Sequence, residues 1–234
     1  MFQTYDDPGG PALGRKHLPR LRKALKAANL DGFIIPHEDE WQNEYVPAAY
    51  DRLAWATGFT GSAGAAVVMT DEAAIFTDGR YTLQVRAQVD GGLFEYRDLV
   101  DGGVPAYLRE KAKPGVRIGY DPKLHSPDSL DRLRAAAEAG GAELVALSVN
   151  PIDEIWDDRP PIPAAKVAPH QESYTGESAS SKRHRLGEGL KADKADAVVI
   201  TSPASIAWLF NVRGGDVART PLPLGEALLR SDGT

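Results

Sequence analysis

The chain has 234 residues, of which 42% are hydrophobic and 26% are charged, and its formal net charge is -6. These values are typical of a globular protein longer than one domain. The negative net charge argues against nucleic acid or anionic lipid as a partner, because either would need a basic face. The absence of cysteine excludes disulfides, thiolate metal sites and a cysteine nucleophile. Residues 1–7 do not resemble a signal peptide and no apolar run approaches about 18 residues, so we expect a cytoplasmic protein and no membrane.

Helix and strand patterns alternate through the first 150 residues. Leu18, Leu21 and Leu25 recur at helical spacing before an apolar strand, and Asp78 is placed to open a helix after a hairpin. Such alternation predicts an α/β fold with a mixed sheet and helices on its faces. In chain order, we expect helices over 18–28, 81–88, 104–112 and 126–140, and strands over 32–35, 65–69, 73–76, 116–120 and 144–147.

The same order of patterns returns in the last third of the chain. A helix precedes the apolar strand 197–200, and Trp208 then takes the place that Trp55 has in the first copy. The sequence separation between Trp208 and Gly214 equals that between Trp55 and Gly61. The repetition predicts two domains of related topology.

The second copy lacks a strand that its pattern requires. Asp232 and Gly233 after an apolar run form a strong hairpin signal, but no return strand follows, so we expect a piece of a longer protein. Ile152 and Trp156 lie near the junction, and we expect them to pack on the first domain. The predicted divisions are a first domain over 1–150, a linker over 151–180 and an incomplete second domain over 181–234.

Side chains that could carry catalysis are scattered. No two of the five histidines have the spacing of a helical metal site. His37 lies beside the acidic run 38–40, where a ligand role is open but a solvated surface is favoured. The glycines of 58–64 precede a strand and do not open a helix, which favours tight backbone packing over a phosphate site. Ser62 has no recognisable base, so a serine hydrolase is not favoured.

Arg80 is the polar residue that stands out. It lies between a predicted strand and a predicted helix, from where a guanidinium can reach a carboxylate on another surface. Position alone leaves two possibilities, an ion pair or contact with a substrate held by another domain, and slightly favours the ion pair. Arg213 raises the same question in the second copy, where we expect a structural pair with Asp216.

Several segments together resemble the three-domain Xaa-Pro aminopeptidases, also called aminopeptidase P. They are GFTGSAG at 58–64, TDGRY at 77–81, EIW and DRP within 154–160, YTG at 174–176 and IAWLFNVRG at 206–214. The resemblance extends from about residue 18 to 234. It implies two creatinase/prolidase N-terminal-type domains, the second truncated. It also implies that the pita-bread catalytic domain, with its two divalent metal ions, usually manganese, is absent.

The resemblance also implies a function for the parent protein. The family releases the N-terminal residue that precedes proline from short peptides, and its N-terminal domains wall the active-site cleft and support a homodimer. On this basis the chain contains no catalytic and no metal-binding residue, and Arg80 corresponds to an arginine near the substrate. The alternative is a stand-alone binding or scaffold module, a pseudo-enzyme without catalysis. We expect the chain by itself to be inactive as a peptidase.

Overall fold

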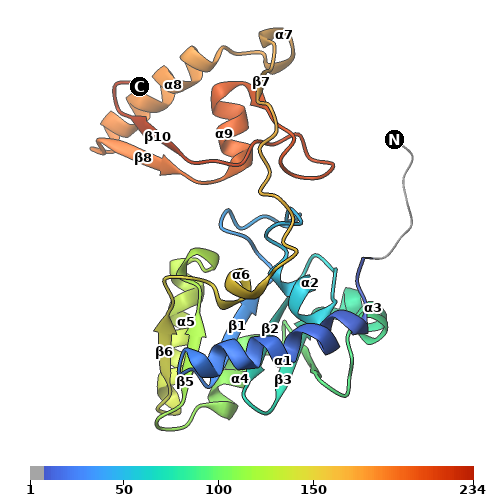
Figure 1. Cartoon of the computed structure of the whole chain (residues 1–234). Coiled ribbons are helices and arrows are strands. Elements are labelled where there is room, and N and C mark those ends of the chain that lie inside the picture. Colours follow the sequence, from blue (N-terminus) through green and yellow to red (C-terminus); the bar gives the residue numbers. More distant parts are fainter. Residues whose placement is uncertain (1–7) are drawn as a thin grey trace. The chain divides into compact units, whose positions relative to one another are not determined.

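The structure, a computed structural model, describes residues 8–234, which form two compact units (Figure 1). The first unit contains the described residues up to Glu40 together with Tyr50–Pro160, and the second contains Trp41–Ala49 and Pro161–Thr234. A short segment of the first third of the chain therefore belongs with the C-terminal residues. The domain limits predicted from the sequence, 1–150, 151–180 and 181–234, stay a proposal.

The first unit is built on one six-stranded mixed sheet. Its strand order is β4-β3-β2-β1-β5-β6; β1, β2 and β3 are antiparallel neighbours, while β4, β5 and β6 each run parallel to the strand beside them. The sheet confirms the predicted α/β class. The sequence interpretation missed β4, because its residues Glu-Tyr-Arg-Asp form no apolar run. The strands are β1 (Gly32–Pro36), β2 (Gly64–Met69), β3 (Ala73–Thr77), β4 (Glu95–Asp98), β5 (Arg117–Tyr120) and β6 (Glu143–Ala146).

Helix ends in this unit follow local signals. Helix α5 begins where predicted, since the Ser126 side chain accepts a hydrogen bond from the Ser129 N–H, Pro127 occupies the first turn and Gly140 follows the last residue. Asp78 caps a short 3-10 turn, η1 (Gly79–Tyr81), which leads into α3. The helices are α1 (Pro11–Ala27), α2 (Arg52–Thr57), α3 (Thr82–Gln88), α4 (Gly103–Lys111), α5 (Pro127–Ala139) and α6 (Pro151–Ile155), with a second 3-10 turn at Pro122–Leu124.

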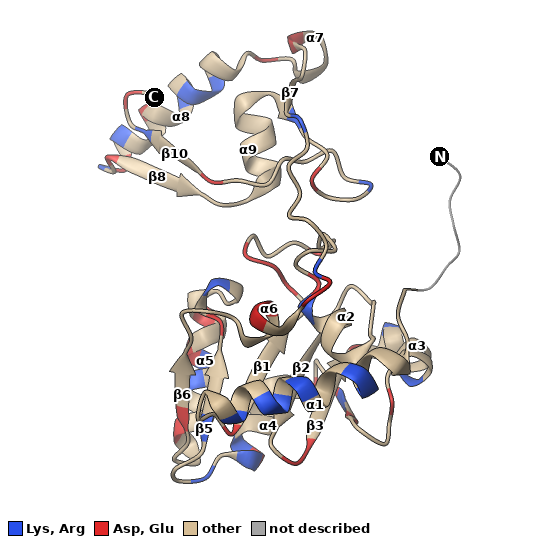
Figure 2. Ribbon diagram, in the orientation of Figure 1, with Lys and Arg blue, Asp and Glu red and all other residues tan. Residues whose placement is uncertain are grey.

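Both faces of the sheet are buried. Helices α1, α2 and α6 pack with Phe33 and Ile35 on one face, whereas α4 and α5 pack with Ile34 on the other (Figure 1). Neighbouring strand residues point to opposite faces, so covering both faces requires the continuous apolar runs seen in β1, β2 and β3. Ile152 is fully buried in the first cluster and Trp156 packs against it, which confirms their predicted role. Lysine and arginine residues are distributed along helix α1 itself (Figure 2).

The second unit repeats the order of the first. Helix α8 (Ala179–Ala192), strand β8 (Ala197–Ile200), helix α9 (Pro203–Phe210) and strand β10 (Ala227–Arg230) correspond to α1, β1, α2 and β2, and β10 pairs antiparallel with β8 as β2 does with β1. Strands β7 (Ala168–Pro169) and β9 (Val212–Arg213) form a second pair, and α7 (Glu172–Thr175) follows β7. The Trp41 indole N–H donates to the Gly225 carbonyl at 3.0 Å, which attaches segment 41–49 to this unit.

Candidate functional site

Arg80 lies at the surface of the first unit, in η1 between the end of β3 and the start of α3. The Asp78 carboxylate accepts a hydrogen bond from the Arg80 backbone N–H at 2.9 Å, which caps this turn. The Arg80 side chain is 64% exposed. The strand-to-helix junction expected from the sequence therefore presents a guanidinium to the surroundings of the unit.

The Asp78 carboxylate also orients the Arg80 guanidinium. Arg80 Nε lies 3.1 Å from each Asp78 carboxylate oxygen, and Nη2 lies 2.7 Å from Oδ2. This fork of charge-assisted hydrogen bonds restricts the plane of the guanidinium. Hydrogen bonds from the Arg80 side chain and backbone lower the pKa of Asp78 below its ordinary value. Asp78 therefore remains an anion at neutral pH.

Tyr81 joins this turn to the glycine-rich segment 58–64. Its phenol oxygen accepts a hydrogen bond from the Ser62 backbone N–H at 3.1 Å and lies 2.9 Å from Ser62 Oγ. Its ring packs edge-on against Phe59, with centroids 5.4 Å apart. A Cβ atom at Gly61 would lie 2.3 Å from the Phe59 ring and 2.7 Å from the Tyr81 ring. This close approach confirms tight packing as the role of the glycine.

Two other candidate residues from the sequence flank the central strands: Ser62 precedes β2 and His37 follows β1. Ser62 has the Tyr81 phenol as a neighbour, so the structure adds nothing to the hydrolase alternative. His37 is buried, and its backbone N–H donates to Gly64. Asp39 is 0% exposed. The favoured interpretation as a solvated surface is therefore wrong for His37 and Asp39, which are buried, whereas Glu38 and Glu40 are partly exposed.

A buried ionic cluster of the first unit was missed by sequence reasoning. The Arg52 side chain is 3% exposed and binds Asp153 through Nε at 2.7 Å and Nη2 at 2.8 Å, while Nη2 also reaches Glu40 at 2.9 Å. Arg159 contacts the same Asp153 carboxylate at 3.0 Å. Burial by itself would lower the pKa of Arg52, but the hydrogen bonds to Asp153 and Glu40 outweigh it and raise that pKa. We call these four residues the Arg52 ion cluster.

Arg213 in the second unit has a structural environment, but not the one predicted. Its Nη1 donates to the Val212 carbonyl at 2.8 Å. Asp216 instead accepts hydrogen bonds from the backbone N–H groups of Ala165 and Leu224, each at 2.8 Å. The expected Arg213–Asp216 pair is therefore wrong, because loop backbone donors take up both carboxylate oxygens.

His17 is buried under α2 as a neutral ring. It is 2% exposed and stacks on Trp55 with centroids 4.0 Å apart. Its Nδ1 lies 2.6 Å from the Trp55 carbonyl oxygen, which can only accept, so Nδ1 carries the proton. Nε2 is buried with no hydrogen-bond partner among residues 8–234. Burial lowers the pKa of His17, because a second proton would place an unsatisfied cation in the core; burial also lowers the pKa of His125.

The first unit should lose stability on acidification below pH 6.5, the ordinary pKa of histidine. The unfolded chain binds protons at His17 and His125 before the folded chain does, so the contribution present above pH 6.5 is lost as pH falls through the lowered pKa values. The slope for each histidine has an upper limit of about 1.4 kcal/mol per pH unit. Urea unfolding between pH 5 and 7.5 measures it. His17→Gln should flatten the slope, and His184→Gln, an exposed residue of the other unit, is the control; equal slopes in wild type and His17→Gln would contradict the prediction.

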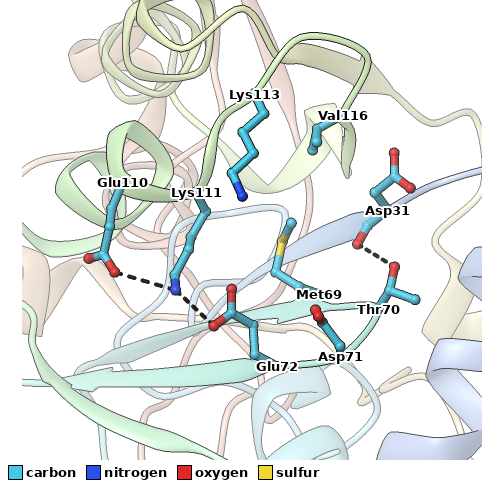
Figure 3. Close-up of a pocket in the computed structure, with 9 residues that line it drawn as sticks. All are labelled: Asp31, Met69, Thr70, Asp71, Glu72, Glu110, Lys111, Lys113 and Val116. Atoms are coloured by element: carbon cyan, nitrogen blue, oxygen red, sulfur yellow. Dashed lines mark hydrogen bonds and ion pairs between the residues drawn. The ribbon is translucent and has the colours of Figure 1, made fainter.

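A cavity of about 310 Å³ opens at the other end of β3 (Figure 3). Glu72 precedes β3 and Arg80 follows it, so the length of the strand separates the cavity from Arg80. Lys111 Nζ lies 2.8 Å from Glu72 and 3.3 Å from Glu110 (Figure 3). Lys111, Glu72 and Glu110 therefore satisfy one another, while Asp31, Asp71 and Lys113 also line the cavity.

Comparison with known proteins decides the family. Residues 17–155 match a family model described as the creatinase/prolidase N-terminal domain, and residues 158–234 match a second model with the same description. The chain belongs to the creatinase/prolidase N-terminal domain family. Two matching models in tandem confirm the two related copies inferred from the sequence, and they place both copies in one family.

Relatives of this creatinase/prolidase N-terminal chain are named as aminopeptidases. A probable Xaa-Pro aminopeptidase P from Talaromyces stipitatus is 36% identical over 93% of this chain, and aminopeptidase P2 from Arabidopsis thaliana is 38% identical over 87%. The chain spans 34% and 29% of those proteins. The crystal structure of an X-prolyl aminopeptidase from Caenorhabditis elegans, described as a cytosolic enzyme with a di-nuclear active site, matches with a TM-score of 0.86 and 29% identity, over 93% of this chain and 37% of that one.

The described part of this creatinase/prolidase N-terminal chain does not fit a two-metal centre. Within residues 8–234, no group of three or more histidine, aspartate or glutamate side chains is arranged to hold a metal ion, and the sequence has no cysteine. Paired-metal sites need several such ligands around each ion. In the same residues, no helix combines the length and apolarity that crossing a bilayer requires.

Proposed function

We propose that this chain is the non-catalytic N-terminal part of a metal-dependent Xaa-Pro aminopeptidase. The observation that carries the proposal is the match, at a TM-score of 0.86 over 93% of this chain, to a solved X-prolyl aminopeptidase of which it covers 37%. The parent protein would release the residue that precedes proline from short peptides. Its two divalent ions, manganese in the proposal, would lie in a part of the protein beyond these two units, because the residues described here do not fit them.

The proposal gives these units two tasks in a cytoplasmic parent enzyme. They wall the cleft that admits short peptides, and they support a homodimer. Arg80 is the substrate-binding residue of the wall. Its support comes from a guanidinium that is 64% exposed and that Asp78 holds in one plane, since arginine suits recognition of carboxylate and carbonyl oxygens.

Peptidase assays on two proteins test the assignment. The product of the complete reading frame, supplied with Mn²⁺, should release the first residue of a peptide with proline in second position and leave a matched peptide with alanine there intact. The 234-residue chain should release nothing under the same conditions. Metal-dependent cleavage by the 234-residue chain would overturn the proposal. A reading frame that ends at codon 234 would favour the scaffold alternative.

Arg80→Ala in the complete enzyme tests the substrate contact. Loss of one charge-assisted hydrogen bond costs about 1.5 to 3 kcal/mol, so kcat/KM should fall about 10- to 100-fold. Arg97→Ala is a matched control, because Arg97 also pairs with surface carboxylates, Glu95 and Glu110, but on β4. An unchanged kcat/KM in Arg80→Ala would remove Arg80 from the substrate site without affecting the family assignment.

A further inference from the structure

We infer that Asp78, Tyr81 and Ser62 are positioning residues that hold the Arg80 guanidinium ready for substrate. The inference rests on the proposed substrate-binding role of Arg80 and extends it to three residues in two separate motifs. We call Asp78, Tyr81 and Ser62 the Arg80 support.

Asp78 restrains the guanidinium at one edge. Its carboxylate meets Arg80 Nε and Nη2 and also caps the backbone of the same turn. The carboxylate is itself held by the turn that begins directly after β3. The guanidinium therefore has one preferred plane, set by the end of a buried strand.

Tyr81 restrains the guanidinium at its face. The Arg80 Cζ atom lies 5.3 Å from the centroid of the Tyr81 ring, within the range of a cation–π contact. The ring cannot swing away freely, because its phenol is bonded to Ser62 and its edge packs on Phe59. Segment 58–64 therefore acts on Arg80 through Tyr81, which gives GFTGSAG a role beyond packing.

Stability alone does not account for this arrangement. Arg80 keeps 64% of its side chain exposed while contacting Asp78 and Tyr81. Exposed ion pairs add little to folding stability, because solvent screens them and ordering a long side chain costs entropy. A guanidinium ordered in advance loses less freedom when a ligand binds. Pre-organisation for a ligand therefore explains the arrangement better than support of the fold.

Steady-state kinetics on the complete enzyme test the Arg80 support. Tyr81→Phe keeps the ring but removes the bonds to Ser62, and Asp78→Asn keeps the shape but weakens the fork. We expect each variant to lower kcat/KM about 3- to 10-fold with an unchanged melting temperature. In an Arg80→Ala background, Tyr81→Phe and Asp78→Asn should have no further effect, because nothing remains to be positioned. The Arg80→Lys variant should not recover wild-type kcat/KM, since lysine lacks the planar fork.

The outcomes separate the two claims. If Arg80→Ala lowers kcat/KM but the effects of Tyr81→Phe and Asp78→Asn persist unchanged in its background, the three residues act only on the fold and the inference is overturned. If Tyr81→Phe and Asp78→Asn are both silent in the wild-type background, it is also overturned. If Arg80→Ala itself is silent, the substrate role of Arg80 fails and the positioning role fails with it.

A second measurement does not depend on activity. ¹⁵N relaxation of the Arg80 Nε–H in the 234-residue chain should show greater mobility of this group in Tyr81→Phe than in the wild type.

Discussion

Arg52→Met should destabilise the first unit by about 3 to 5 kcal/mol, the usual cost of removing one partner from a buried ion pair. Arg52 is the centre of the Arg52 ion cluster, and its removal leaves the Asp153 and Glu40 carboxylates without their main cation. Glu40 Oε2 is already buried with no hydrogen-bond partner among residues 8–234, so the loss of Arg52 is felt most at Glu40, while Arg159 stays beside Asp153. Urea unfolding of wild type and variant at neutral pH measures the difference.

Two further variants make the Arg52 result specific. Arg97→Met removes a cation that pairs with exposed carboxylates, Glu95 and Glu110, and should cost less than about 1 kcal/mol. Adding Glu40→Gln and Asp153→Asn to Arg52→Met should recover part of the loss, because neutral groups carry a smaller desolvation penalty. Equal losses in Arg52→Met and Arg97→Met would show that burial of Arg52 does not matter.

Gly58→Ala should destabilise the first unit by about 3 kcal/mol, from two additive causes. Gly58 ends α2 in the left-handed region with φ +90°, which costs a residue with a Cβ atom about 1 to 2 kcal/mol. The Cβ atom would also lie 2.1 Å from the Gly10 carbonyl oxygen and 2.7 Å from that of Gln88, and overpacking costs about 1 to 3 kcal/mol. Both obstacles are backbone atoms, which cannot rotate away as a side chain can.

Gly115→Ala separates the two causes for Gly58. Gly115 also has a positive φ, +86°, but nothing lies within 4 Å of the position its Cβ would take. Gly115→Ala should therefore lower the free energy of unfolding only by the conformational cost of the positive φ, about 1 to 2 kcal/mol. Thermal or urea unfolding of both variants gives the comparison, and an equal cost for Gly58→Ala and Gly115→Ala would contradict the close approach at Gly58.

The sequence by itself determined the features that depend on neighbours along the chain. Continuous apolar runs marked β1, β2 and β3, and Ser126, Pro127 and Gly140 marked the ends of α5, because caps and burial patterns act within a few residues. The repeated order of patterns indicated two related copies, and the motifs resembled the family that the comparisons then showed.

Only the tertiary structure decided which distant residues meet. Arg52 and Asp153 are 101 residues apart, and nothing local to either predicts their bond. The polar strand β4 exists because β3 offers it a parallel edge, and segment 41–49 joins the second unit through Trp41. The link from Ser62 through Tyr81 to Arg80 likewise requires two motifs to be brought together by the β2–β3 pair. Local propensity is encoded residue by residue, whereas these contacts depend on how the sheet closes around its core.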